Sequence, residues 1–365
     1  MKKNIFSLQP NLDDFIPALE EEKIQSAKMR PAASFWKDGF KRLFHNPIAI
    51  ICIVVLAIMI LAAIFIPMFW PYGYSEQLAI NKYGADINYM QWCSLGNEDS
   101  FANLKPFQYS PYEQYLRSNG ESVFPHLFGT DDLGRDYFIR VIYGMRVSLA
   151  VGFFASVIVF IIGTIYGSIA GFCGGKVDMV MMRIVDVIYS LPDMLIIILL
   201  SVVLKEVLTD KIEGTFLESI GVGMISIFIV YGMLYWVGMA RMVRGQIMAI
   251  KKQEFVLAAR TIGTSPIKII FKHLLPNCVS IIIVMTALQI PSAIFTESFL
   301  SYVGLGVALP MPSLGSLASD ASKLSVMLGY AYRLYVPAAA ICLLVLALNL
   351  LGDALRDAFD PKLRK

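Results

Sequence analysis

Long apolar runs constrain this chain more than any other feature of its sequence. Six of them occur, over residues 48–70, 147–172, 180–204, 219–240, 279–303 and 336–355. A helix of about 20 apolar residues crosses the roughly 30 Å hydrocarbon core of a bilayer, because it rises about 1.5 Å per residue. With 57% hydrophobic and only 16% charged residues, the chain also lacks the polar surface of a water-soluble domain. We therefore predict an all-α, polytopic membrane protein with six transmembrane helices.

The positions of lysine and arginine predict how these helices are oriented. Most of the 31 basic residues fall in the N-terminal segment, in 241–277 and in the C-terminal tail, and the short loops on the other side carry few. Because cytoplasmic loops carry the excess of basic residues, we expect both termini in the cytoplasm. The expected parts are a cytoplasmic N-terminal segment over 1–46, a first transmembrane helix over 47–70, an extracytoplasmic segment over 71–146, a five-helix core over 147–358 and a cytoplasmic tail over 359–365.

The N-terminal segment is too polar for a cleaved signal peptide, so we expect the first transmembrane helix to remain as an anchor. At helical spacing, the end of this segment places aromatic side chains such as Phe40 and Phe44 on one face and Lys37 and Lys41 on another. This pattern predicts an amphipathic helix that lies in the membrane interface.

No arrangement of side chains in the sequence predicts catalysis, a metal site or a nucleotide site. The three histidines are scattered over different segments: His45, His126 and His273. The glycine-rich stretch 171–176 departs from a phosphate-binding loop, since Ala170 replaces its first glycine and no serine or threonine follows the lysine. The net charge of +3 is too small to indicate nucleic acid. We therefore expect no catalytic residue, no metal and no cofactor in this chain.

Polar residues inside the apolar runs are a second place to look for function. A charge near the bilayer centre costs about 2.5–3.5 kcal/mol on insertion scales, so such residues line a path or pair across helices. Asp186 and Asp193 flank Pro192 in the third run, Glu297 lies in the fifth and Asp353 closes the sixth. We expect Asp186 and Asp353 to pair or to lie near an interface. For Glu297 an ion path and a helix contact both stay open.

Small residues form a stripe in the second apolar run. Gly163, Gly167 and Gly171 recur every fourth residue. That spacing lets another helix approach closely, so it predicts tight helix packing and not a binding site.

The segment 245–277, between the fourth and fifth runs, predicts a helix–turn–helix. Residues 254–261 are typical of a helix, and Gly263 suits the left-handed position that follows a helix end. Thr264 or Ser265 can cap a second helix with Pro266 at its first position. Pro276 is expected to end this second helix where the fifth span begins.

The second predicted helix carries an apolar stripe of Ile267, Ile270, Phe271 and Leu274, with lysines off the stripe. Two small residues, Ala258 and Ala259, lie in the helix before it. Small residues and an apolar stripe together predict docking of a soluble partner. The alternative is a helix that lies flat on lipid.

Four separated motifs carry a resemblance to a known family. Residues 254–263 (EFVLAARTIG) with 273–277 (HLLPN) resemble the EAA loop of binding-protein-dependent ABC importer permeases. The other three motifs resemble the C-type permease of dipeptide/oligopeptide importers: 128–136 (FGTDDLGRD) with 140–149 (RVIYGMRVSL), 297–306 (ESFLSYVGLG) with 310–315 (PMPSLG), and 182–186 (MRIVD) with Leu191-Pro192. The likeness runs from Phe35 to Arg356. Leu257 stands where the EAA loop has its usual glutamate, and Leu314 where tryptophan is usual.

The resemblance implies an ABC type I importer permease fold in the bacterial cytoplasmic (inner) membrane and a chain that is not itself catalytic. It also implies partners: a second homologous permease subunit, two cytoplasmic ABC ATPase subunits that bind ATP and Mg, an extracytoplasmic substrate-binding protein or lipoprotein, and a peptide substrate. The residues implied in coupling to the ATPase are Glu254, Ala258, Ala259, Arg260, Gly263, Pro266 and Pro276. Those implied in the pore or in helix packing are Asp186, Pro192, Glu297, Gly304 and Gly306.

Two alternatives remain at this point. An ion-coupled secondary transporter would use Glu297 and Asp186 as relays, but the cytoplasmic helix–turn–helix and the lack of a detectable inverted repeat with broken helices count against it. Among ABC permeases, relatives carry nickel–chelator complexes, glycans or antimicrobial peptides. No cluster of histidine or methionine favours a metal cargo.

Overall fold

The computed structural model describes residues 35–95, 101–212, 214–215, 221–307 and 311–359. Among these residues there is no strand, and one isolated bridge pairs Thr130 with Asp136. The chain divides into two units between Arg42 and Leu43. A helix, α2 (Phe35–Leu43), forms where the sequence predicts one, and its last residue is the first of the second unit. Its place in the membrane interface stays a prediction, and residues 1–34 and 360–365 lie outside the described residues.

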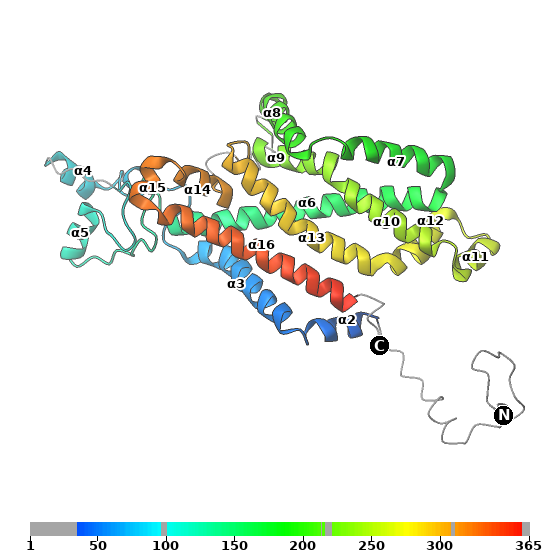
Figure 1. Cartoon of the computed structure of the whole chain (residues 1–365). Helices are drawn as coiled ribbons and strands as arrows, with labels where there is room; N and C mark the ends of the chain where they lie inside the picture. The colour runs from blue at the N-terminus through cyan, green and yellow to red at the C-terminus, as the bar shows by residue number, and fades with distance from the viewer. Residues whose placement is uncertain (1–34, 96–100, 213, 216–220, 308–310, 360–365) are drawn as a thin grey trace, which may run out of the picture. The chain divides into compact units, whose positions relative to one another are not determined.

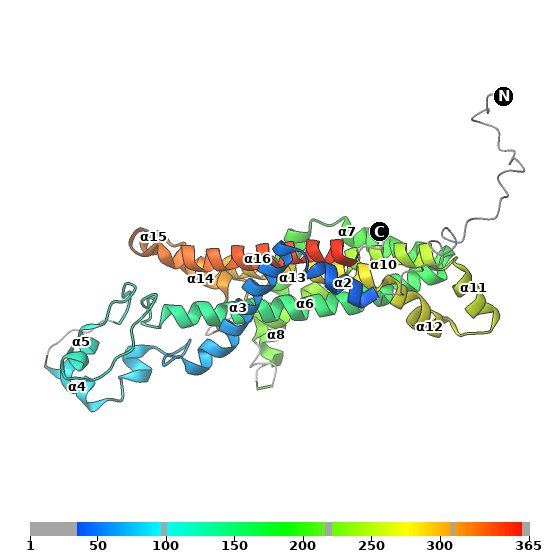
Figure 2. The same ribbon diagram turned by 90° about the horizontal axis from the view of Figure 1, so that it is seen from below.

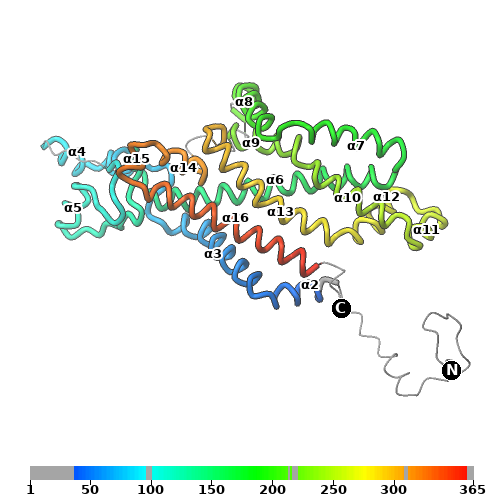
Figure 3. Tube along the Cα trace, in the orientation of Figure 1, coloured from blue at the N-terminus to red at the C-terminus, as the bar shows by residue number. Residues whose placement is uncertain are grey.

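Five helical runs of the described residues are long and apolar enough to cross a membrane. Three of them are α3 (Pro47–Phe69), α6 (Tyr137–Cys173) and α16 (Tyr332–Phe359). The run Val222–Ile250 consists of α9 (Val222–Val230), η4 (Tyr231–Tyr235) and α10 (Trp236–Ile250). The run Pro266–Tyr302 consists of α12 (Pro266–Ile269), η5 (Ile270–Leu274) and α13 (Leu275–Tyr302). In the bundle, α6 packs against α10 and α13, and α16 packs against α13 and α3 (Figures 1 and 3).

The third apolar run does not form one straight helix. It is divided into α7 (Gly175–Tyr189) and α8 (Asp193–Ile212), which are bent by 85°. While α7 follows α10, α8 turns away from the bundle (Figures 1 and 2). Pro192 causes the break, because proline has no N–H and disfavours helical backbone at the residue before it. The third span predicted over 180–204 is therefore a bent pair of helices, and six spans result if this pair counts as one.

The glycine stripe of α6 packs against α10, as predicted. A Cβ built on Gly163 would lie 2.6 Å from Cβ of Met239, and one on Gly171 would lie 2.9 Å from the carbonyl oxygen of Arg244. A Cβ on Gly167 would overlap the carbonyl oxygen of Ala240. The two backbones therefore approach closely enough that only glycine fits at these positions.

The end of the bundle opposite α11 (Glu254–Thr261) carries several short helices (Figures 1 and 2). They are η2 (Leu78–Lys82), α4 (Ile87–Ser94), α5 (Pro111–Ser118), α14 (Leu314–Ala321) and α15 (Leu324–Tyr330). Residues before α6 have an aromatic core of their own that includes Tyr72, Tyr83, Phe101 and Tyr112. The helix α6 begins before the second apolar run, because Asp136 caps it by accepting a hydrogen bond from Ile139 N at 3.0 Å.

Candidate functional site

A helix–turn–helix connects α10 to α13, as the sequence predicts. The turn after α11 contains Gly263, whose φ of +82° is the left-handed conformation that favours glycine. The N–H of Thr264 donates to the carbonyl of Ala259 at 3.0 Å and closes the helix end. Pro266 then occupies the first turn of α12. Ser265 stands at the N-cap position in extended conformation, but its side chain makes no capping hydrogen bond.

One face of this helix–turn–helix is packed into the bundle. Val256 and Leu274 are fully buried, and Ala259 is only 7% exposed. All three belong to the same hydrophobic cluster as residues of α6, α8 and α10. The loop is therefore fixed to the ends of the spans by its own apolar contacts.

The opposite face exposes large apolar side chains. Ile262 is 84% exposed and Ile267 is 70% exposed. With Leu257 and Phe271 these residues form a set that we call the loop patch. The prediction of one continuous apolar stripe is therefore wrong. Ile270 and Leu274 are buried against the bundle, whereas Ile267 and Phe271 are exposed.

The remaining residues predicted for coupling lie on the surface of the chain. Glu254, Ala258, Arg260 and Gly263 are exposed. Ala258 is exposed while Ala259 is buried, so the two alanines face different surroundings and do not form one contact surface. The Arg260 guanidinium lies over the Phe172 ring at 4.9 Å from its centroid.

Pro276 does not end the second helix, contrary to the prediction. The helical run continues from Pro266 to Tyr302, with the π-helical turn η5 just before Pro276. A local π turn re-pairs backbone groups that a proline leaves free, which lets a helix continue through it.

Charged side chains tie the start of the helix–turn–helix to the bundle. Nζ of Lys251 donates to the carbonyl of Gly171 at 2.6 Å, at the end of α6. About two helix turns before Lys251, Arg244 donates to both carboxylate oxygens of Asp178 on α7, with 2.6 Å between Nη2 and Oδ2. The helix–turn–helix and the helix before it are therefore joined to α6 and α7 by polar contacts as well as by packing.

Glu297 is fully buried and joins α13 to α6. Oε2 accepts from the hydroxyl of Ser148 at 2.7 Å, and Oε1 accepts from the hydroxyl of Ser301 at 2.7 Å. Gly306 lies against Ser301, where an added Cβ would come within 2.5 Å of the serine Cβ. Of the two roles left open for Glu297, this geometry favours the helix contact.

The other polar residues of the apolar runs lie near the surface of the chain. Asp186 accepts a hydrogen bond from Arg241 across α7 and α10 at 2.8 Å, which agrees with the expected pairing. Asp353 is exposed on α16. Gly304 follows α13 with a φ of +87°, so its role in the structure is to turn the chain.

The break at Pro192 opens a cavity of 540 Å³ between α7, α8, α10 and α13. The lining includes Pro192, Asp193, Tyr235, Gln289 and Ser292. Pro192 and Asp193 stand out in the sequence as a proline and a charge within an apolar run, but the other polar residues come from distant segments with no motif of their own.

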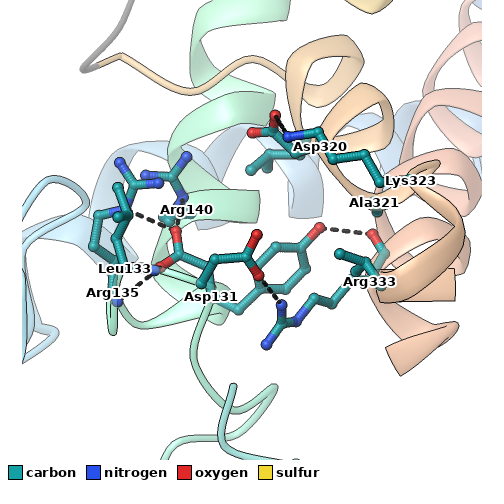
Figure 4. Close-up of a pocket in the computed structure, with 12 residues that line it drawn as sticks. Asp131, Leu133, Arg135, Arg140, Asp320, Ala321, Lys323 and Arg333 are labelled. Carbon is teal, nitrogen blue, oxygen red and sulfur yellow. Dashed lines mark hydrogen bonds and ion pairs between the residues drawn. The ribbon is translucent and has the colours of Figure 1, made fainter. Parts of the chain in front are cut away.

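A cluster of charged side chains lies at the end of the bundle opposite α11 and was not predicted from the sequence (Figure 4). The Asp131 carboxylate pairs with Nε of Arg135 at 2.7 Å and with Nε of Arg140 at 3.3 Å. Arg333, at the start of α16, pairs with Asp132 at 2.9 Å. These residues line a cavity of 260 Å³ and join residues 131–140 to α16. The Asp131 motif was visible as a resemblance, but nothing in the sequence near Arg333 indicates its partner.

His126 was also missed, because its partners are not at a metal-binding spacing. It is fully buried between Asp136, 2.8 Å from Nδ1, and Glu113, 3.2 Å from Nε2. Burial alone would lower the pKa of His126, but hydrogen bonds to Asp136 and Glu113 outweigh it and raise the pKa to about 9. The imidazolium ties the capping box of α5, formed by Ser110 and Glu113, to the N-cap of α6. This contact is structural.

Fold and site together define a class: a polytopic helical membrane protein with an apolar helix–turn–helix at the junction of two long helical runs and, among the described residues, no cluster fit to hold a metal. Comparison with known proteins gives the family. The chain belongs to the family described as binding-protein-dependent transport system inner membrane component, whose model matches residues 163–365. Residues 34–88 match the N-terminal transmembrane domain of oligopeptide transport permease C. The resemblance found in the sequence is confirmed.

Individual relatives match nearly the whole chain. The oligopeptide transport system permease protein OppC of Bacillus subtilis is 39% identical over 346 residues, which is 95% of this chain and 94% of that protein. The dipeptide transport system permease protein DppC of the same organism is 38% identical over 363 residues, which is 98% of this chain and 97% of that protein. Among solved structures, an inward-facing MetNI methionine ABC transporter is similar with a TM-score of 0.47 and 22% identity, covering 61% of this chain and 97% of that one.

Proposed function

We propose that this chain is the permease subunit of an ATP-driven importer of di- and oligopeptides and forms half of its translocation path. The names of its relatives support the substrate class, because proteins named for oligopeptide and for dipeptide transport match 95% and 98% of the chain. The chain itself has no catalytic role in this proposal.

The observation that carries the proposal is the loop patch. Four large apolar side chains stand exposed on a short helix–turn–helix whose other face is fixed in the bundle. An exposed apolar patch on a well-packed element is typical of a protein contact. We propose that an ABC ATPase subunit covers it, and that the contacts of Lys251 and Arg244 pass the movement of the ATPase to α6 and α7 as a rigid body.

The proposal includes an orientation and a set of partners. The helix–turn–helix and both termini face the cytoplasm, as the basic residues predict, and the cluster around His126 and Arg333 faces outward. The partners are a second homologous permease, two ATPase subunits that bind ATP and Mg, and an extracytoplasmic binding protein that delivers the peptide.

Uptake by the reconstituted complex tests this function. Proteoliposomes would contain this chain, its sister permease and both ATPase subunits, with binding protein outside and ATP inside. We expect accumulation of labelled peptide that stops on ATP depletion and continues with an uncoupler. Accumulation that survives ATP depletion and stops with the uncoupler would instead support the ion-coupled alternative.

A further inference from the structure

The cavity at the break of the third run has the composition of a small-ligand site. Its volume is 540 Å³, within the range of about 300–1,000 Å³ that such sites occupy. Most of its lining is apolar, including Ile188, Leu191 and Ile196. A few polar groups converge among these side chains: Asp193, Tyr235, Gln289 and Ser292.

The cavity lies along the spans and not at their ends. Tyr235 and Gly238 stand near the middle of the run Val222–Ile250. Gln289 and Ser292 stand in the interior of the run Pro266–Tyr302. Non-helical backbone such as the Ser190–Pro192 break is tolerated at membrane depth where it lines a cavity or is buried in protein.

Asp193 places a carboxylate in this cavity. Its side chain is exposed, and Oδ1 accepts the N–H of Met194 at 2.9 Å. In the part of the chain that the structure describes, no basic side chain forms an ion pair with it. A carboxylate inside a span faces water or a partner group and not lipid. The cavity is therefore a place where a cationic group is favoured.

We propose that this cavity is a binding site on the translocation path for the amino-terminal end of the transported peptide, with Asp193 receiving its α-ammonium group. The proposal rests on the function proposed above. Every peptide with a free amino terminus carries this cation, so the contact suits a transporter that accepts many sequences. Tyr235, Gln289 and Ser292 supply donors and acceptors for the first amide groups of the peptide.

Gly238 allows the cavity to be filled without disturbing the chain. It lines the cavity, and a Cβ added to it meets no atom within 4 Å. Gly245 is a matched control, because it lies two turns further along the same face of α10, has equally open space, and is not part of the cavity lining. In the complete transporter, we expect Gly238→Leu to lower kcat/KM for peptide uptake about tenfold or more, with ATP hydrolysis retained. Gly245→Leu should stay within about twofold of the unmodified protein.

Asp193→Asn tests the chemistry of recognition. It preserves side-chain size and the acceptor for Met194 N–H but removes the charge. Uptake of a peptide with a free amino terminus is compared with that of the same peptide acetylated at its amino terminus. We expect the preference for the free peptide to fall about tenfold, and Asp193→Glu to restore most of it.

Three results would overturn the proposal: unchanged uptake in Gly238→Leu, equal losses in Gly238→Leu and Gly245→Leu, or an equal loss of both peptides in Asp193→Asn. Failure of the proposed function would look different. In that case the unmodified transporter would show no ATP-driven uptake of either peptide.

Discussion

Asp178 on α7 accepts hydrogen bonds from both Nε and Nη2 of Arg244 on α10. The pair joins the first half of the broken third run to the helix that leads into α11. Bidentate contacts between arginine and a carboxylate fix distance and orientation together. This pair therefore connects the helix–turn–helix to the region of the break at Pro192.

Arg244→Lys should uncouple the helix–turn–helix from α7, because lysine keeps the charge but cannot make the bidentate contact with Asp178. We expect ATP-driven uptake to fall about tenfold, with membrane insertion and ATPase assembly retained. Asp186→Asn is the control, since it keeps an oxygen that can accept from Arg241, removes only the charge of an exposed ion pair and should change uptake little. Equal uptake in Arg244→Lys and the unmodified protein would exclude this route of coupling.

Ala258→Trp should block the ATPase contact. Ala258 is exposed beside the loop patch, so a large ring there leaves the interior unchanged and obstructs a partner surface. We expect co-purification of the ATPase subunits to fall at least about tenfold, while Ala258→Ser behaves as the unmodified protein. The ATPase remaining bound to Ala258→Trp would contradict the docking surface.

Ala259→Trp and Gly263→Trp should act differently, through the fold of the loop. Ala259 is buried, so overfilling its site costs about 1–3 kcal/mol. At Gly263 the positive φ adds about 1–2 kcal/mol of backbone strain for any other residue. Faster proteolysis of residues 251–275 in both variants, but not in Ala258→Trp, is the expected observation.

Glu297→Gln should retain ATP-driven uptake, because glutamine still offers polar groups to Ser148 and Ser301. Glu297→Leu leaves two buried hydroxyls without their acceptor and should cost about 1–3 kcal/mol of stability, seen as a lower melting temperature in detergent. Loss of uptake in a stable Glu297→Gln protein would support an ion path in place of a helix contact.

His126 makes the stability of the segment around α5 depend on pH. Its pKa is raised from 6.5 to about 9, so the contact stabilises fully below pH 6.5 and is lost as pH rises through about 9. The loss is on the order of 3 kcal/mol. Amide exchange in residues 110–137, corrected for intrinsic rates, should therefore increase between pH 6.5 and pH 9.5, and His126→Gln should abolish this dependence. If amide exchange in His126→Gln depended on pH as it does in the unmodified protein, titratable groups other than His126 would cause the effect.

Features that depend on local spacing could be predicted from the sequence. The apolar runs, the glycine stripe of α6 and the turn at Gly263 each follow from residues within one or two helix turns. The break at Pro192 could have been expected from the missing N–H, but an apolar run has the same composition whether it is straight or bent. For the same reason, periodicity alone did not show that Ile270 faces inward and Ile267 outward.

Contacts between distant segments could not be predicted. Arg333 pairs with Asp132 across about two hundred positions of sequence, and no motif surrounds it. The cavity beside Asp193 likewise depends on Tyr235 and Gln289, which become neighbours only when η4 and α13 pack around the break. Each of these residues is ordinary in its local sequence, and its role exists only in the folded chain.

Site-directed photo-cross-linking from Ile262 tests the central claim most directly. Ile262 is the most exposed residue of the loop patch, and Leu133, exposed near the opposite end of the bundle, is the control position. In the active transporter we expect a photoreactive residue at position 262 to cross-link to an ATPase subunit, and one at position 133 to give no such product. An active transporter with no ATPase product from position 262, or with equal product from both positions, would contradict the account.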